Sequence, residues 1–485
     1  MKAKIQPNDK NFIEAITAIL IIAAVAVFLF VNFVTGYSLA AYVFAAVFGF
    51  ALSLFYPRSG FYAIVFLTMV FERFFTLVPI YWNRTEYKIY PLDILFGGVI
   101  LGAAVQYFSD RKKIEFKTVD WLVGFFILAS AVYFFVSVFF LQADFSIAFS
   151  TFKNYAFYGL FYFAVRFLFQ DRAKLMSLIK FILAGAISVI IFIVVGVLHG
   201  EGLWTEFTPL STAGTRILAF PHAFYLSMAA LIALSWIAFK RDNFSNFLKV
   251  IIPVWTIGIV GSLMRHLWIS LFVSIFVLYF FLPEANRRKI RNLFVHYLFA
   301  GIVIAILLSY LAFLFPNSAV SKVFSNALSV TGTRFVSTAQ ISADESLNWR
   351  KSVWQSTWQE YKNSLAFGLG YGKKVSVEIG TKYKDFVEIR NIHNSLLTIF
   401  IQMGLWSAAL LGFVFWLLAG PLVKRNIQNI SPDDQFLRIV FLALFVNYLV
   451  AFLFQTYLET NLLGIFFWII MGSLQNTNLA KYENE

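Results

Sequence analysis

Long runs without charged residues dominate this chain of 485 residues. A helix needs about 20 consecutive apolar residues to cross a bilayer, and runs of that length recur along the whole sequence. The apolar fraction is 60% and the charged fraction 13%, which is more apolar than a soluble core requires. A transmembrane barrel would show short segments of alternating polarity instead. The sequence therefore predicts an all-α, polytopic, integral membrane helical bundle.

The apolar runs define fourteen candidate spans, and we expect about 12–14 transmembrane helices. The candidates are 12–34, 37–56, 60–80, 91–108, 120–141, 150–169, 175–198, 218–239, 247–263, 264–282, 293–315, 393–420, 436–454 and 456–474. The first is too long for a signal-peptide core and has no small-residue cleavage site after it, so we interpret it as a true span. No repeat or linker is evident, which predicts a single transmembrane domain over residues 1–485 that includes a large loop at 316–392.

The positions of the lysines and arginines predict the orientation of the chain. With the N-terminus in the cytoplasm, 22 of the 39 lie inside or at inner flanks, and 5 lie in short outer segments. Short cytoplasmic loops carry such an excess in membrane proteins. Both termini are therefore expected in the cytoplasm, and the loop 316–392 outside. The net charge of +14 then reflects contact with anionic membrane lipids, and it does not indicate a nucleic-acid partner.

The large loop contains a predicted amphipathic helix. Its aromatic and leucine side chains recur at helical spacings, which favours packing over the bundle or lying at the membrane interface. These side chains are Leu347, Trp354, Trp358, Tyr361 and Leu365. The glycines at 368, 370 and 372 resemble part of a dinucleotide-binding loop, but no strand precedes them, so we interpret them as a backbone turn.

The chain has no cysteine, which excludes disulfides and thiolate metal ligands. His199, His222 and His266 are expected near the outer face, and His296 inside. These histidines leave a zinc site as an alternative, although they show no short-range ligand spacing. We therefore expect no metal and no cofactor.

Two other polar features need an interpretation. Glu72 and Arg73 fall inside an apolar run, where an internally satisfied ion pair is the simpler interpretation and a cavity lining is the functional one. The C-terminal segment 476–485 is polar and is expected to be a solvated end.

Arg216, Arg265 and His393 all fall at the outer ends of predicted spans, although they are far apart in the sequence. An arginine beside so much apolar sequence needs water, a partner or a ligand, unless it extends to lipid headgroups at the interface. Guanidinium groups bind phosphate through two parallel hydrogen bonds. A neutral histidine nearby could take a proton from an attacking hydroxyl. Together these residues suggest a lipid-linked diphosphate substrate.

Four motifs, in order, resemble the O-antigen ligase and O-antigen polymerase family of membrane proteins. The first is "TRILAFPH" with Arg216 and Pro221, and the second is "MRHLWISL" with Arg265. The third lies in the large loop and comprises Arg350, Trp354, Gly368 and Gly370. The fourth is "HNSLLTIFIQMGLW", which comprises His393, Asn394, Leu397 and Gly404. The resemblance covers about residues 205–420, and His222 stands where the family often has asparagine.

The resemblance implies a lipid-linked glycan transferase of lipopolysaccharide biosynthesis in the bacterial inner membrane. Such an enzyme moves a glycan from undecaprenyl diphosphate to an acceptor sugar hydroxyl at the periplasmic face, by a metal-independent, inverting displacement. It implies that His393 is the general base and that Arg216 and Arg265 hold the donor diphosphate. Arg390 and Asn394 are possible supporting residues, on position alone.

Two alternatives stay open at this point. A ligase would pass the glycan to lipid A–core, whereas a polymerase would pass it to another lipid-linked glycan. The HNxxL pattern, with a glycine eleven residues after His393, inclines us to the ligase. A flippase or transporter for lipid-linked oligosaccharides is the competing class, although transporters usually show internal repeats and broken helices that meet at the midplane.

Overall fold

A computed structural model describes residues 7–82, 85–109, 115–199, 216–318, 329, 332, 345–379, 385–389, 392–424 and 431–479. Helices account for most of these residues, as the sequence predicts, and the all-α membrane fold is confirmed. Among the described residues, eight helices are long and apolar enough to cross a membrane. Four shorter apolar helices accompany them.

The helices of the first half of the chain correspond to the first seven predicted spans. They are α1 (Pro7–Thr35), α2 (Leu39–Phe55), α3 (Pro57–Phe71), α4 (Arg73–Thr76), α5 (Pro91–Ser109), α6 (Thr118–Phe135), η1 (Val136–Phe140), α7 (Phe145–Phe152), η2 (Lys153–Phe157), α8 (Leu160–Leu168), α9 (Arg172–Ser188) and α10 (Ile190–His199). The elements η1 and η2 are π-helical turns. A short antiparallel hairpin, β1 (Ile80–Trp82) and β2 (Thr85–Tyr87), follows α4.

The second half of the chain contains the remaining helices and a second hairpin. The helices are α11 (Phe220–Phe239), α12 (Asn243–Gly261), α13 (Arg265–Phe281), α14 (Glu284–Leu314), α16 (Glu345–Tyr361), α17 (Ser395–Met403), α18 (Leu405–Lys424), α19 (Pro432–Phe452) and α20 (Asn461–Leu479). The hairpin pairs β3 (Val375–Ile379) with β4 (Asp385–Ile389).

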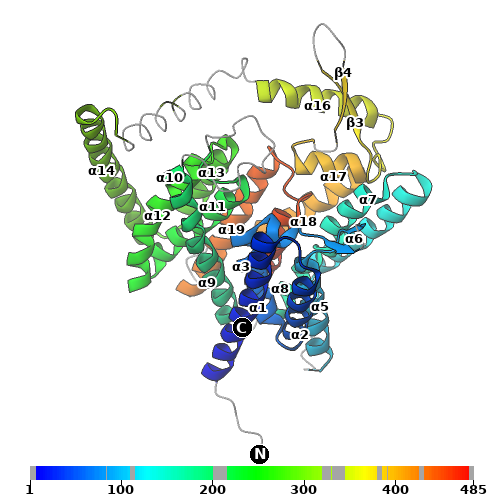
Figure 1. Ribbon diagram of the computed structural model, residues 1–485, viewed down its shortest axis with the longest axis horizontal. Coiled ribbons are helices and arrows are strands. Elements are labelled where there is room, and N and C mark those ends of the chain that lie inside the picture. Colours follow the sequence, from blue (N-terminus) through cyan, green and yellow to red (C-terminus); the bar gives the residue numbers. More distant parts are fainter. Residues whose placement is uncertain are drawn as a thin grey trace, which may run out of the picture.

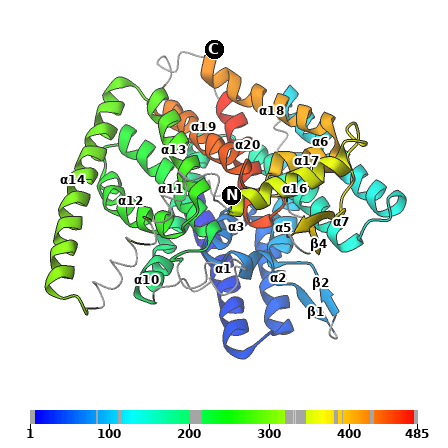
Figure 2. The same cartoon turned by 90° about the horizontal axis from the view of Figure 1, so that it is seen from above.

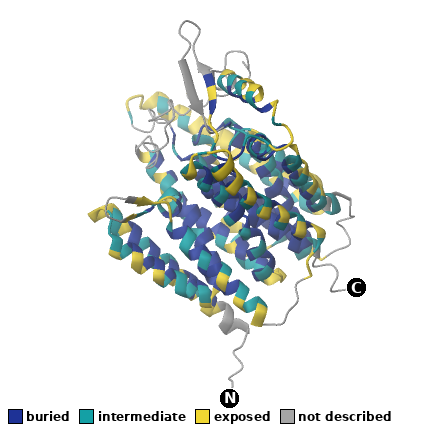
Figure 3. Ribbon diagram, turned by 90° about the vertical axis from the view of Figure 1, so that its right-hand side faces the viewer, coloured by how far each residue is buried: buried dark blue, intermediate teal, exposed yellow. Residues whose placement is uncertain are grey.

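Helices α11 and α19 form the buried centre of the bundle. The most apolar stretch of α11 is 94% buried and that of α19 is 83% buried. Helix α14 is the opposite case, because none of its most apolar stretch is buried, and it stands at the edge of the molecule (Figure 2). Helix α16 and the β3–β4 hairpin lie at the end of the molecule opposite the start of α1 (Figures 1 and 3). These described parts of the large loop are thus gathered at one end of the bundle.

Two predicted spans are interrupted at a residue with positive φ. The span 60–80 breaks at Glu72, which separates α3 from α4 and has a φ of 45°. The span 393–420 breaks at Gly404, which separates α17 from α18 and has a φ of 89°. Helix α17 has only nine residues, which is too short to cross a bilayer. The structure therefore corrects the single span 393–420 to a short helix followed by the longer apolar helix α18.

Position 404 requires a glycine because the backbone of the large loop packs directly against it. A Cβ atom at Gly404 would collide with the carbonyl oxygen of Ala366. Gly368 lies against the same break, with a φ of 72°, and its Cβ would lie 2.6 Å from the backbone of Gln402. Backbone hydrogen bonds from Leu369 to Ile401 (2.7 Å) and from Leu405 to Leu365 (2.9 Å) join the two segments. The backbone-turn interpretation of Gly368, Gly370 and Gly372 is confirmed, because all three adopt positive φ.

Helix α16 forms as predicted, but among its described side chains the buried face coincides with the predicted stripe only at Tyr361. Val353, Thr357 and Tyr361 are buried, and they recur every four residues. Trp354 and Trp358, which the sequence places in the packed stripe, are 37% and 50% exposed. The stripe therefore packs within the protein at Tyr361 but leaves the two tryptophans partly exposed, and the interfacial arrangement that the pattern also allows stays open for them. Tyr361 packs against Phe400 of α17 and shares a small apolar core with Val353.

The polar segment after residue 475 is also less solvated than expected. Asn476 is 3% exposed and donates from Nδ2 to the carbonyl oxygens of Val165 (3.1 Å) and Phe169 (3.0 Å). Its side-chain oxygen accepts a hydrogen bond from Arg166, which also pairs with Asp120 at 2.8 Å. The end of α20 is therefore packed up to Thr477, because an intramembrane arginine needs these partners.

Candidate active site

His393 lies in the turn before α17, outside the apolar helices. Its φ is +57°, a left-handed conformation that is uncommon for residues other than glycine. The ring is half-buried, and Nδ1 lies 2.6 Å from Oε1 of Gln455. An amide oxygen can only accept a hydrogen bond, so Nδ1 donates the proton. The other ring nitrogen, Nε2, is then the one with a free lone pair.

Asn394 begins α17. Its side-chain oxygen accepts a hydrogen bond from the backbone N–H of Leu397 at 3.0 Å, which satisfies one of the unpaired donors of the first turn. Its Nδ2 donates to the carbonyl oxygen of Leu453 at 3.3 Å. Asn394 therefore fixes the start of the helix and ties it to the turn between α19 and α20, next to His393.

That turn is held by a network around Glu459. One carboxylate oxygen of Glu459 accepts from Ser395 at 2.8 Å, and the other accepts from Tyr155 at 2.8 Å. Asn154 donates to the backbone carbonyl of Glu459 at 2.7 Å. The network fixes the segment on which Gln455 stands, so it controls the position of the His393 ring indirectly.

The π-helical turn η2 supplies Asn154 and Tyr155, and a buried ion pair anchors it. Lys153 pairs with Asp93 of α5 at 2.7 Å, and Tyr158 donates to the same carboxylate at 2.5 Å. Single π-turns inside α-helices frequently occur at functional sites. In this turn the consecutive residues Lys153, Asn154 and Tyr155 bind two different partners. Lys153 binds Asp93, and the other two bind Glu459.

A group of basic side chains faces the same region. Arg216 precedes α11 and is buried, with 8% exposure, and the adjacent Ile217 N–H donates to the carbonyl of Gly261 at 3.0 Å. His266 is buried at the start of α13, and its Nε2 lies 2.9 Å from the hydroxyl of Tyr457. Arg216, Arg350 and His393 are all close enough to His266 to interact with it electrostatically. Residues from four distant parts of the chain therefore meet at one place.

Arg265 is the first residue of α13, immediately before His266, and its side chain is partly buried. Arg350 lies on α16, one turn before Trp354, whose Nε1 donates to the carbonyl of Ile392 at 2.9 Å. That bond ties α16 to the residue before His393. Arg350 thus joins Arg216 and His393 around His266, and Arg265 adjoins His266 in the sequence. We refer to Arg216, Arg265, Arg350 and His393 as the outer basic cluster, after the side of the membrane that the sequence predicts for them.

The electrostatic surroundings keep His393 neutral. Burial lowers its pKa below the ordinary value, and the positive charge of Arg350 lowers the pKa further, while the hydrogen bond to Gln455 acts in the opposite direction. A neutral imidazole with Nδ1 protonated can accept a proton at Nε2. The site therefore combines a proton acceptor with a concentration of permanent positive charge.

Several residues considered from the sequence lie elsewhere or cannot be placed. His222 is fully buried in α11, where its backbone N–H donates to Glu72 at 3.0 Å and its Nε2 lies 3.2 Å from the carbonyl oxygen of Val70. Glu72 is thus satisfied by His222. Arg390 and the side chain of His199 lie outside the described residues. Within the ranges that the structure describes, no group of three or more His, Asp or Glu side chains is arranged to hold a metal ion.

No sequence motif includes Gln455, Ser395, Tyr155 or Glu459 as a predicted site residue. Glu459 alone had a detectable signal, since it is an acidic residue within the apolar run 456–474. The others are ordinary polar residues whose importance comes from the contacts that folding creates.

Comparison with known proteins finds a family match for part of the chain. A family model described as O-antigen ligase matches residues 249–417, which include Arg265, Arg350 and His393 and leave out Arg216. No curated protein matches the chain. The resemblance drawn from the sequence is therefore confirmed as a match to the O-antigen ligase family over residues 249–417.

Proposed function

We propose that this protein is an inverting glycosyltransferase that moves a glycan from undecaprenyl diphosphate to an acceptor sugar hydroxyl. The observation that carries the proposal is the His393–Gln455 hydrogen bond within the outer basic cluster. With Nδ1 protonated, Nε2 of His393 can act as the base, and the arginines of the cluster supply the positive charge that a diphosphate leaving group needs. The O-antigen ligase family supports an enzyme that acts on lipid-linked glycans in a membrane.

The proposed reaction is a single displacement. Nε2 of His393 takes the proton of the acceptor hydroxyl as the acceptor oxygen forms a bond to the anomeric carbon of the donor glycan. The bond between that carbon and the diphosphate oxygen breaks at the same time, and undecaprenyl diphosphate leaves with the electron pair. Attack opposite the leaving group inverts the anomeric configuration. The proton on His393 returns to water after the product departs.

The arginines hold the donor and stabilise the charge that develops on the leaving group. Arg216 and Arg265 are proposed as the diphosphate ligands, since guanidinium groups stay charged at every physiological pH. Arg350 is close enough to His393 to interact with it, so it is placed to act where the bond breaks. Fixed positive charges of this kind lower the barrier without a reorganisation step. We therefore propose a mechanism without metal or cofactor.

We propose the ligase subtype, with lipid A–core as the acceptor, on the motif from His393 to Gly404. A polymerase acting on a second lipid-linked glycan would use the same chemistry. A transporter would need its groups near the midplane, between repeats. The outer basic cluster instead lies beside α16 and α17, at one end of the bundle (Figure 1).

The proposed setting is the bacterial inner membrane, with both termini in the cytoplasm and the site on the periplasmic side. The whole chain would then act as one transmembrane domain, with the large loop 316–392 over the outer end. The positive-inside distribution of lysine and arginine supports this orientation.

The proposal is tested with purified protein, a diphosphate-linked donor and an acceptor glycan. His393→Ala should reduce transfer by about 100-fold or more and leave donor binding unchanged, because a general base contributes at least that factor. His296→Ala is the matched control, since His296 is exposed on α14 and is expected to retain full activity. Full activity in His393→Ala would disprove the assignment of the base. A chelator should leave transfer intact.

A further inference from the structure

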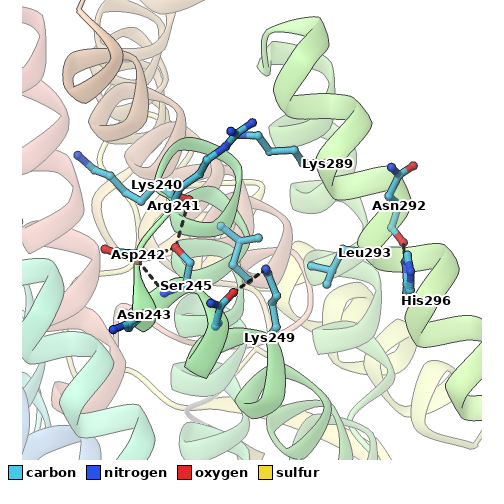
Figure 4. Close-up of a pocket in the computed structure, with 12 residues that line it drawn as sticks. Lys240, Arg241, Asp242, Asn243, Ser245, Lys249, Lys289, Asn292, Leu293 and His296 are labelled. Carbon is cyan, nitrogen blue, oxygen red and sulfur yellow. Dashed lines mark hydrogen bonds between the residues drawn. The ribbon is translucent and has the colours of Figure 1, made fainter.

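A second basic site lies away from the outer basic cluster, between the α11–α12 turn and α14. It is a cavity of about 740 Å³. Its lining combines cationic, polar and apolar side chains, among them Lys240, Arg241, Lys249, Lys289 and His296 (Figure 4). We refer to it as the α12–α14 cavity. By the positive-inside distribution it faces the cytoplasmic leaflet.

Among the described residues that line the α12–α14 cavity, Asp242 is the one with a carboxylate, and it already accepts hydrogen bonds from neighbouring donors. Asp242 caps α12 by accepting from the N–H of Ser245 at 2.7 Å and from the Ser245 hydroxyl at 2.7 Å. It also accepts from Trp236 Nε1 at 3.3 Å. These donors hold the carboxylate at the helix start, so it is not turned toward the basic side chains. Lys240 pairs with Asp433 at 2.5 Å, which leaves the positive charge of the cavity to Arg241, Lys249 and Lys289.

Two of these cations come from separate elements and converge. Arg241, from the α11–α12 turn, and Lys289, from α14, extend toward each other in Figure 4, and they are close enough to repel one another. Lys289 Nζ donates to the carbonyl of Ala238 at 2.7 Å, and this bond holds it in place against the repulsion. Like charges held together in this way form a site for an anion, which would relieve the repulsion.

The surroundings of the cavity indicate that the anion has an apolar part. Next to Asn292 and His296 along α14, the apolar side chains of Val295, Leu298 and Phe299 are 60%, 66% and 70% exposed. On the facing helix, Val250 of α12 is 68% exposed. The hydroxyl of Tyr297 donates to the carbonyl of Lys249 at 2.7 Å and keeps α12 and α14 together at this level. A basic floor with apolar walls matches an amphiphile with a phosphate headgroup.

We propose that the α12–α14 cavity binds the phosphate headgroup of an anionic phospholipid, whose acyl chains lie against the exposed apolar faces of α12 and α14. Basic pockets between transmembrane helices on the cytoplasmic side bind such headgroups. The lipid would also cover α14, whose most apolar stretch contains no buried residue within the described part of the protein. The inference is independent of glycosyl transfer, because none of these residues belongs to the outer basic cluster.

The test uses the full chain in a neutral detergent with phosphatidylglycerol added to the micelles. Phosphatidylglycerol should raise the Tm of the wild-type protein, because a ligand that binds only the folded state stabilises it. The double variant Arg241→Gln/Lys289→Gln should bind the lipid about tenfold more weakly or worse, and its Tm rise should shrink accordingly. The control is Arg288→Gln/Arg291→Gln, which removes the same charge from α14 outside the cavity and should keep the wild-type response.

Three outcomes would overturn the proposal. The first is an equal loss of response in both double variants, which would show a general charge effect. The second is an equal Tm rise with phosphatidylcholine, which has no net charge. The third is a full response to inorganic phosphate alone, which would mean that a free anion, and not a lipid, is the ligand. If the double variant does not fold, Arg241→Glu alone is used, because Arg241 is exposed and its replacement leaves the Lys289 bond in place.

Discussion

Nδ1 of His393 donates a hydrogen bond of 2.6 Å to Oε1 of Gln455, across 62 residues of sequence. This bond fixes the tautomer of the proposed base and leaves Nε2 as the ring nitrogen that can take a proton. The geometry resembles that of histidines in other enzymes, where a partner on one ring nitrogen sets the chemistry of the other. In the proposed mechanism Gln455 is a positioning residue, and its replacement should change the behaviour of His393 in measurable ways.

Replacing Gln455 with leucine should lower kcat by about 10–100-fold and leave KM for the donor nearly unchanged, since the base would lose its tautomer preference and orientation. Gln455→Glu should retain more activity. Its carboxylate would still accept from Nδ1 but would favour the protonated ring, so the acid limb of the pH–rate profile should move to higher pH. A profile that stays in place in Gln455→Glu would contradict the positioning role.

The pH dependence of the wild-type enzyme follows from the pKa of His393. The neutral ring is the active form, and burial followed by the charge of Arg350 lowers the pKa below the ordinary value of 6.5. The acid limb of the kcat/KM profile should therefore be centred below pH 6.5. Arg350→Gln should raise this pKa and move the decrease toward neutral pH. An acid limb that is centred above pH 7 in the wild type would contradict the assignment.

Donor binding should depend on the arginines of the outer basic cluster. Arg216→Gln and Arg265→Gln should each weaken the binding of a non-reactive diphosphate donor analogue by about 10–100-fold, because a hydrogen bond to a charged group contributes about 1.5–3 kcal/mol. Equilibrium binding to protein in nanodiscs measures this directly. Arg288→Gln, on the exposed face of α14, is the control and should bind like the wild type. Unchanged affinity in both test variants would remove the diphosphate assignment.

Gly404→Ala should destabilise the protein by more than about 1 kcal/mol, since alanine is strained at a φ of 89° and its Cβ would collide with Ala366. The matched control is Gly412→Ala in α18, where nothing lies within 4 Å of an added Cβ. Alanine is the better helix former, so this variant should have an unchanged or higher Tm. Thermal unfolding of both variants separates the effect of the break from that of a lost glycine.

The orientation can be tested directly because the chain has no cysteine. Single cysteines at Lys373 and Arg288, whose side chains are 53% and 67% exposed, provide unique reporters for the two sides. A membrane-impermeant maleimide applied to spheroplasts should label Lys373→Cys at once and Arg288→Cys only after permeabilisation. The reverse pattern would invert the proposed topology and place the outer basic cluster in the cytoplasm.

The sequence by itself determined the membrane fold, the positions of most helices and the residues that the family motif singles out. These are local properties: apolar run length, charge placement and the motif from His393 to Gly404 can all be read in a short window. The breaks at Glu72 and Gly404 could not be read in this way, because each depends on a contact with a distant segment, His222 in one case and Ala366 in the other.

The tertiary structure decided which residues surround His393. Gln455 and Glu459 lie in an unremarkable turn, and only folding brings that turn against Ser395 and the π-helical residue Tyr155. Arg350 lies close enough to His393 to interact with it, on a helix that is buried at Tyr361, which the hydrophobic stripe includes, and at Val353, which it does not. A hydrophobic pattern specifies that a helix forms and inserts. The partners of each polar side chain depend on how all the helices pack together, and no single window of sequence contains that information.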